Sequence, residues 1–138
     1  MSYKKVFLDS DIILDMLLKR EPFAIFSQIL FNGTIPSLQL HTSTLIIANV
    51  HYFLKKETNK VIAKELIKQV VAELVVLPFD LTHITAAANS NHVDFEDSIQ
   101  YYIAKQNDCD LIITRNIKHY KDFDIQVLTA EQFLRKIL

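Results

Sequence analysis

Short, largely apolar runs alternate with helix-like segments along the chain, and this alternation limits the folds that it can adopt. The strand-like runs cover residues 5–8, 38–42, 75–77, 110–114 and 126–128. Strands that are apolar on both sides are buried on both faces, as in a parallel sheet with helices above and below it. We therefore predict an α/β fold with a central parallel sheet covered by helices.

Helical periodicity and capping residues predict the segments between the strands. We expect helices over 11–19, 23–31, 44–56, 59–74, 82–89, 94–106, 117–120 and 130–137. Ser43 is the expected N-cap of the third helix, because a serine side chain accepts hydrogen bonds from free N–H groups there. Since no linker, repeat or low-complexity segment interrupts the pattern, residues 1–138 are predicted to form one domain.

The composition excludes several classes of function. Gly33 is the only glycine, whereas a P-loop or a dinucleotide fingerprint needs several glycines next to phosphate. The lone cysteine, Cys109, cannot form an internal disulfide, which is typical of a reducing compartment. No secretory leader and no apolar run of about 20 residues is present, so we expect a soluble, cytoplasmic protein. With a net charge of -1, any phosphate-binding surface must be a local patch.

Acidic and amide side chains follow the apolar runs. Asp9 comes directly after the first strand, Asn116 follows the strand over 110–114, and Asp94 and Asp97 open a helix. The carboxyl ends of parallel strands form one rim of a sheet, where ligands bind. Oxygen ligands gathered at that rim predict a site for a hard divalent cation and an enzyme that acts on phosphate esters.

Each of these acids also has an ordinary structural interpretation. Asp9 can cap the helix that follows it, and Asp11 can be a first-turn residue that the helix dipole favours. Asp94 and Asp97 can serve the same purpose at their own helix start. However, two carboxylates on one helix face repel each other unless a cation lies between them.

Asn49 is a polar residue on the predicted third helix, at a position where the helical periodicity otherwise gives apolar residues. It lies between Leu45 and Phe53, and a helix that turns this stripe toward the sheet also turns Asn49 inward. A buried amide needs partners, so Asn49 either pairs with neighbouring backbone or borders the acidic pocket.

Four motifs in this order closely resemble the PIN domain, a family that includes the ribonuclease toxins of bacterial toxin–antitoxin operons. They are Phe7-Leu8-Asp9-Ser10-Asp11-Ile12-Ile13-Leu14-Asp15, Thr42-Ser43-Thr44, Asp94-Phe95-Glu96-Asp97-Ser98-Ile99-Gln100 and Ile112-Ile113-Thr114-Arg115-Asn116. The resemblance extends to the closing strand and helix and so covers essentially the whole chain. It implies a three-layer α/β/α sandwich whose acidic pocket binds Mg²⁺ or Mn²⁺ and cuts RNA with metal-activated water.

The resemblance also implies roles for individual residues. The catalytic residues would be Asp9, Asp97 and Asn116, and the metal ligands Asp9, Asp97 and Asp94. Substrate-binding residues would be Thr114, Arg115, Ser43 and Asn49. Asn49 stands where the family usually has a glutamate, and Asn116 is neutral as well. Fewer carboxylates predict weaker metal binding than at a four-acid site.

Three functions remain open. The first is a toxin-type ribonuclease with an antitoxin protein as its partner. We expect this ribonuclease to be a homodimer, and the aromatic residues of the helix over 23–31 (Phe23, Phe26, Phe31) could form the dimer interface. The second is a PIN module with an eroded metal site that binds RNA or protein without cutting. The third is a phosphotransferase of the haloacid dehalogenase kind, because Asp9-Ser10-Asp11 mimics its paired aspartates.

Overall fold

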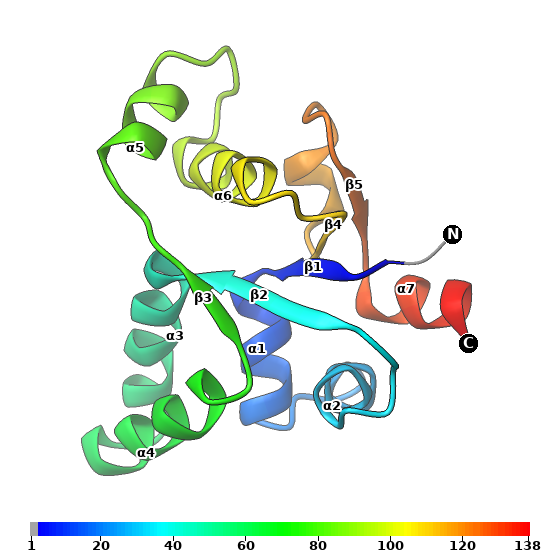
Figure 1. Cartoon of the computed structure of the whole chain (residues 1–138). Helices are drawn as coiled ribbons and strands as arrows, with labels where there is room; N and C mark the ends of the chain where they lie inside the picture. The colour runs from blue at the N-terminus through cyan, green and yellow to red at the C-terminus, as the bar shows by residue number, and fades with distance from the viewer. Residues whose placement is uncertain (1–2) are drawn as a thin grey trace.

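Five short parallel strands form one sheet in the computed structural model, which describes residues 3–138 (Figure 1). The strand order is β3-β2-β1-β4-β5, and every neighbouring pair is parallel. The strands are β1 (Lys5–Leu8), β2 (Gln39–Ser43), β3 (Val75–Leu77), β4 (Leu111–Ile113) and β5 (Gln126–Leu128). The α/β prediction with a central parallel sheet is confirmed.

Helices cover the sheet on both sides. On one side lie α1 (Ser10–Leu17), α2 (Ala24–Phe31), α3 (Thr44–Glu57) and α7 (Ala130–Ile137), with α4 (Lys60–Val71) packed against α3. On the other side lie α5 (Leu81–Ala88) and α6 (Phe95–Gln106), and a short 3₁₀ helix, η1 (Ile117–Tyr120), follows β4. No helix within residues 3–138 is both long and apolar enough to cross a bilayer.

The inward stripe of α3 differs from the sequence prediction. Ile46, Val50 and Leu54 are the buried residues of this helix, whereas Phe53 is 45% exposed. The predicted stripe through Leu45, Asn49 and Phe53 is therefore displaced by one position, and Asn49 lies half-buried at its edge. The helix is apolar around much of its circumference, so the tertiary packing against α1 and the sheet selects the buried face.

The sequence predicts an apolar face for the fourth helix, α4, through Ile62, Leu66, Val70 and Leu74, and this face differs from the structure at Ile62. Ala63 and Val70 are its buried residues, while Ile62 is 47% exposed and the helix ends three residues before Leu74. The reason is that α4 packs on α3, where a small alanine permits close approach, rather than directly on the sheet.

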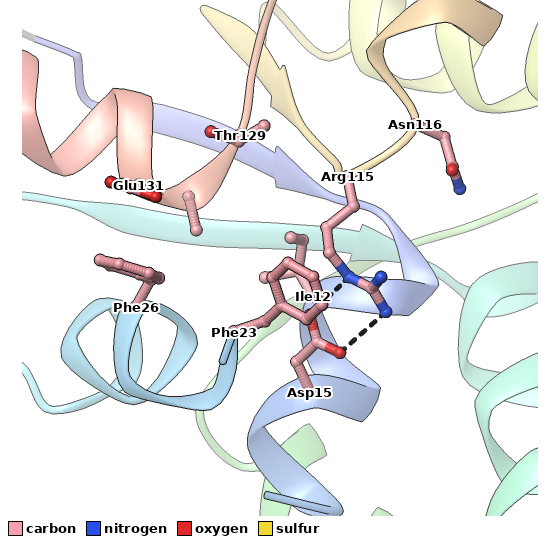
Figure 2. Close-up of a pocket in the computed structure, with 9 residues that line it drawn as sticks. Ile12, Asp15, Phe23, Phe26, Arg115, Asn116, Thr129 and Glu131 are labelled. Carbon is pink, nitrogen blue, oxygen red and sulfur yellow. Dashed lines mark hydrogen bonds and ion pairs between the residues drawn. The ribbon is translucent and has the colours of Figure 1, made fainter. Parts of the chain in front are cut away.

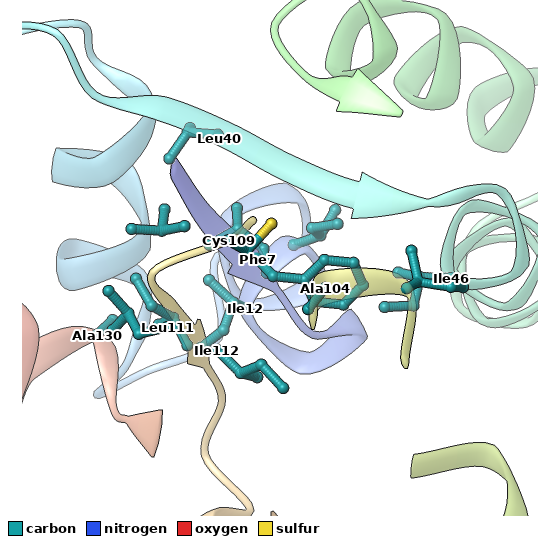
Figure 3. Packing of buried hydrophobic residues seen from close by; sticks show 14 of the residues in the cluster. Phe7, Ile12, Leu40, Ile46, Ala104, Cys109, Leu111, Ile112 and Ala130 are labelled. Atoms are coloured by element: carbon teal, nitrogen blue, oxygen red, sulfur yellow. The ribbon is translucent and has the colours of Figure 1, made fainter. Parts of the chain in front are cut away.

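The strand order reverses between β1 and β4. The chain runs from β1 outward to β2 and β3 and then returns to the other side of β1 for β4 and β5. Phe7 on β1 and Ile112 on β4 are paired in register and fully buried, and Ile12 of α1 packs in the same core (Figure 3). In open α/β sheets the crevice outside the carboxyl ends of two such strands is the usual ligand site.

Candidate metal and nucleic-acid site

Asp9 is held firmly at the carboxyl end of β1. The register pairs Leu8 with Ile113, so the next residues, Asp9 and Thr114, lie side by side where β1 and β4 end. The N–H of Asp9 donates to the carbonyl of Ile113 at 3.0 Å, and Oδ2 accepts from the Thr114 hydroxyl at 2.9 Å and from the Tyr120 hydroxyl at 3.3 Å. Asp9 also caps α1, so its structural and functional interpretations are compatible.

Asp11 lies in the same group, although the sequence pattern favoured a plain first-turn role for it. Its Oδ2 accepts from the main-chain N–H of Arg115 at 3.0 Å and from Nδ2 of Asn116 at 3.3 Å. Its Oδ1 is buried and has no hydrogen-bond partner in the described structure. The Asp9-Ser10-Asp11 spacing was the available signal, but the contacts that matter come from a loop about a hundred residues later.

Asp97 reaches the group from the first turn of α6. Its Oδ2 is buried without a hydrogen-bond partner within residues 3–138, although Nδ1 of His119 lies 3.4 Å away. Asp94 has a different position: it is exposed and caps α6, because its Oδ1 accepts from the N–H of Asp97 at 2.8 Å. The predicted metal ligand Asp94 therefore has an established structural role, and Asp11 is the third carboxylate beside Asp9.

The three carboxylates have raised pKa values. Burial, together with the charge of Asp9, raises the pKa of Asp11 to about 6. Burial, followed by the charges of Asp94 and Asp9, raises the pKa of Asp97 to about 6. Burial also raises the pKa of Asp9, and burial with the nearby carboxylates raises that of Tyr120. Burial is the largest cause for each carboxylate, and neighbouring carboxylates add to it for Asp11 and Asp97, so a nearby cation would favour the charged forms.

A divalent ion would need water or substrate as additional ligands here. Within residues 3–138, no three His, Cys, Asp or Glu side chains form a group that could hold a metal ion by themselves. Mg²⁺ usually keeps several waters and takes one or two carboxylates plus substrate phosphate oxygens. The unpartnered oxygens of Asp11 and Asp97 are the donors that such an ion requires, so the residues present fit a hydrated ion better than a closed protein cage.

The remaining predicted site residues divide into interior and surface positions. Thr114 and Ser43 are fully buried; Thr114 holds Asp9, and the Ser43 hydroxyl donates to Gln100 and accepts from the N–H of Ile46. Ser43 is thus the predicted helix cap, and its surroundings do not support substrate contact. Asn116 is exposed beside Asp11, where a substrate could reach it.

A buried ion network lies directly beneath the acidic group. Asp15 is fully buried, and its two oxygens accept from Nε and Nη2 of Arg115 at 2.9 and 3.1 Å. Arg20 donates to the same carboxylate at 2.9 Å, and the Arg115 guanidinium lies 4.1 Å above the centre of the Phe23 ring. Figure 2 shows the Asp15–Arg115 pair of this network, with Phe23 beside it. These residues line a cavity of about 240 Å³ between α1, α2 and the start of α7.

The chain is similar to known proteins in both sequence and fold. The PIN domain family matches residues 5–118. The chain is 33% identical to ribonuclease VapC1 of Aquifex aeolicus (strain VF5), across 99% of this chain and 97% of that protein. The fold resembles VapBC-1 of nontypeable Haemophilus influenzae (TM-score 0.69, 17% identity, covering 91% of this chain and 98% of that one). It also resembles a toxin–antitoxin complex from Klebsiella pneumoniae (TM-score 0.69, 16% identity, covering 91% and 97%).

Proposed function

The chain belongs to the PIN domain family, and we propose that it is a metal-dependent ribonuclease, the toxin of a toxin–antitoxin pair. The observation that carries this proposal is the pair of buried, unpartnered carboxylate oxygens on Asp11 and Asp97, at the crevice where β1 and β4 end. The full-length similarity to a protein named as a ribonuclease supports the choice of RNA as the substrate.

Asp9, Asp11 and Asp97 would hold Mg²⁺ or Mn²⁺. Their raised pKa values mean that burial disfavours the negative charge, and a neighbouring cation would favour it. Such an ion would activate water for attack on the RNA backbone and would neutralise charge on the scissile phosphate.

The other side chains position these groups and the substrate. Thr114 and Tyr120 donate to Oδ2 of Asp9, which fixes the orientation of that carboxylate. Asn116 is anchored by its N–H to the Thr114 hydroxyl at 3.0 Å, and its exposed amide would orient an RNA phosphate or the attacking water. Arg115 contributes positive charge next to the same phosphate.

A ribonuclease assay with Mn²⁺ tests the proposal. Wild type should cleave RNA, whereas Asp9→Asn and Asp97→Asn should lose cleavage by at least about a hundredfold while keeping their circular dichroism spectra. Asp124→Asn is the matched control, because the Asp124 side chain is 95% exposed. Equal cleavage by wild type and both site variants would exclude this active site.

A PIN module that binds RNA without cutting it is the second candidate. The observation in its favour is that the described residues hold no complete cage of three acidic, histidine or cysteine ligands. Asn49 and Asn116 are also neutral where additional carboxylates could stand. RNA binding by wild type with no cleavage in Mn²⁺ or Mg²⁺ would support this candidate over the nuclease.

We propose an antitoxin protein as the partner, since similar folds occur in VapBC and toxin–antitoxin complexes. Co-expression with the neighbouring reading frame should give a stable complex that loses ribonuclease activity. A homodimer that acts in the cytoplasm remains part of the proposal, and sedimentation of the purified chain measures its oligomeric state. The aromatic face suggested for the dimer is partly engaged elsewhere, because Phe23 and Phe26 line the cavity beside Arg115.

A further inference from the structure

The cavity beside the acidic group has the shape and chemistry of a small binding site. Its apolar walls are Ile12 of α1, Phe26 of α2 and Phe23, which directly precedes α2 (Figure 2). Arg115 and Asn116 also line it, and both contact Asp11 of the acidic group. Its volume of about 240 Å³ is below the usual range for a drug-sized ligand, about 300–1,000 Å³, so it fits a single ring system.

The first turn of α7 gives this cavity a polar edge. Thr129, Ala130 and Glu131 line it, and the capping box of α7 uses the N–H of Gln132 and of Thr129. The N–H groups of Ala130 and Glu131 therefore remain as donors in the first turn of the helix. The Glu131 carboxylate, which contacts Arg135 through Oε2 only, adds an acceptor in Oε1.

The cavity lies directly beside the proposed catalytic group. Asp15 lies in the lining but is fully buried between Arg20 and Arg115, and the Arg115 side chain remains partly exposed. The lining also contains Glu131, whose carboxylate pairs with Arg135, and Asn116, which contacts Asp11 in the proposed catalytic group. An RNA phosphate near the carboxylates would thus have its neighbouring base within reach of the cavity.

We propose that this cavity binds one unpaired nucleobase of the RNA substrate, next to the scissile phosphate. The base packs against the rings of Phe23 and Phe26, and its polar edge meets the amides and carboxylate at the start of α7. Unpaired RNA bases are recognised in this way, by stacking on aromatic or guanidinium planes and by hydrogen bonds to their edges. The inference rests on the proposed ribonuclease function, and it assigns this cavity as the site that recognises one base of the RNA substrate.

Binding of RNAs with single abasic sites tests this inference without catalysis. The probe is a short, fluorescein-labelled, single-stranded RNA of mixed sequence, compared by anisotropy in EDTA with versions that each lack one base. One abasic position should weaken wild-type binding by roughly five- to a hundredfold, the usual contribution of one stacked base. Phe26→Leu should bind the parent RNA equally weakly and should show no further loss with that abasic RNA.

Phe53→Leu is the control, because it makes the same substitution of an aromatic ring on a helix, but Phe53 lies outside the cavity. It should retain the full abasic penalty, and thermal melts confirm that both variants fold. If wild type cleaves RNA but binds every abasic probe as tightly as the parent RNA, this inference alone is overturned. The cavity would then be a candidate site for a partner protein instead. Wild type that neither binds nor cleaves RNA would overturn the ribonuclease proposal together with it.

Discussion

Asp15 and Arg115 form a bidentate ion pair that joins α1 to the loop after β4. The two carboxylate oxygens accept from Nε and Nη2 of Arg115 at 2.9 and 3.1 Å. The main-chain N–H of the same arginine donates to Asp11 at 3.0 Å. A buried carboxylate that is no part of the acidic group therefore fixes the loop that carries Asn116 and connects stability to the geometry of the site.

Asp15→Ala should destabilise the protein by about 2–4 kcal/mol. Removal of the buried acceptor leaves two arginines without their partner, although both are partly exposed and recover some hydration. Urea unfolding measures the change. Asp124→Ala, which removes a carboxylate from an exposed pair, should shift stability by less than about 0.5 kcal/mol. Equal midpoints for the two variants would mean that the buried network contributes little.

Asp11→Asn should impair cleavage far more than Asp94→Asn. Asp11 presents a buried, unpartnered oxygen beside Asp9, whereas Asp94 is exposed and already caps α6. We expect at least about a hundredfold loss for Asp11→Asn, and less than about tenfold for Asp94→Asn, because asparagine is an equally good N-cap. Single-turnover cleavage with Mn²⁺ compares them. The reverse order would return Asp94 to the metal site in place of Asp11.

Local sequence patterns were sufficient for most of the fold. The bounds of β1, β3 and β5 agree with prediction, because an apolar run that ends in a polar residue or proline defines a buried strand. The predicted inward residues were wrong at Phe53 of α3 and Ile62 of α4, on helices with more than one apolar face. There the partner helix selects the buried side, and no local pattern contains that information.

Some residues of the candidate site could likewise be identified from local sequence, and others depend on tertiary contacts. Asp9 and Asp97 could be found from their places after a strand and at a helix start. For Asp11 the Asp9-Ser10-Asp11 spacing was the only signal, and its first-turn interpretation was favoured, because its contacts with Arg115 and Asn116 form only after the chain has folded. The cavity lined by Phe23 and Glu131 was missed for the same reason, since α2 and α7 are distant in sequence.

The metal-free protein should lose stability as pH rises from about 4 to 6. The folded protein keeps protons on Asp11 and Asp97 up to a pKa of about 6, whereas the unfolded chain releases them near 3.8. The folded state binds more protons in this interval, so its stability is greatest below it and declines through it.

Asp97→Asn should consequently raise the melting temperature in EDTA at pH 7.5, by roughly 3–6 °C for each kcal/mol of repulsion removed. At pH 4 the gain should nearly disappear, because the native aspartate is then protonated in the fold. Calorimetric scans at both pH values provide the comparison, with Asp124→Asn as the exposed control. An unchanged or lower melting temperature at pH 7.5 would show that Asp97 is not under electrostatic strain.

Asn49→Glu should tighten Mn²⁺ binding. Asn49 lies half-buried on α3, which starts at the carboxyl end of β2 beside β1, and the resemblance in sequence predicts an acidic residue at this position. An added carboxylate near the cluster should increase affinity by about tenfold or more, since charges a few ångströms apart interact strongly in a partly buried site. Titration calorimetry measures the change, and Ala48→Glu, an exposed neighbour on the same helix, controls for net charge. Equal affinities for the two variants would place the Asn49 side chain away from the metal and leave Asp9, Asp11 and Asp97 as its only protein carboxylates.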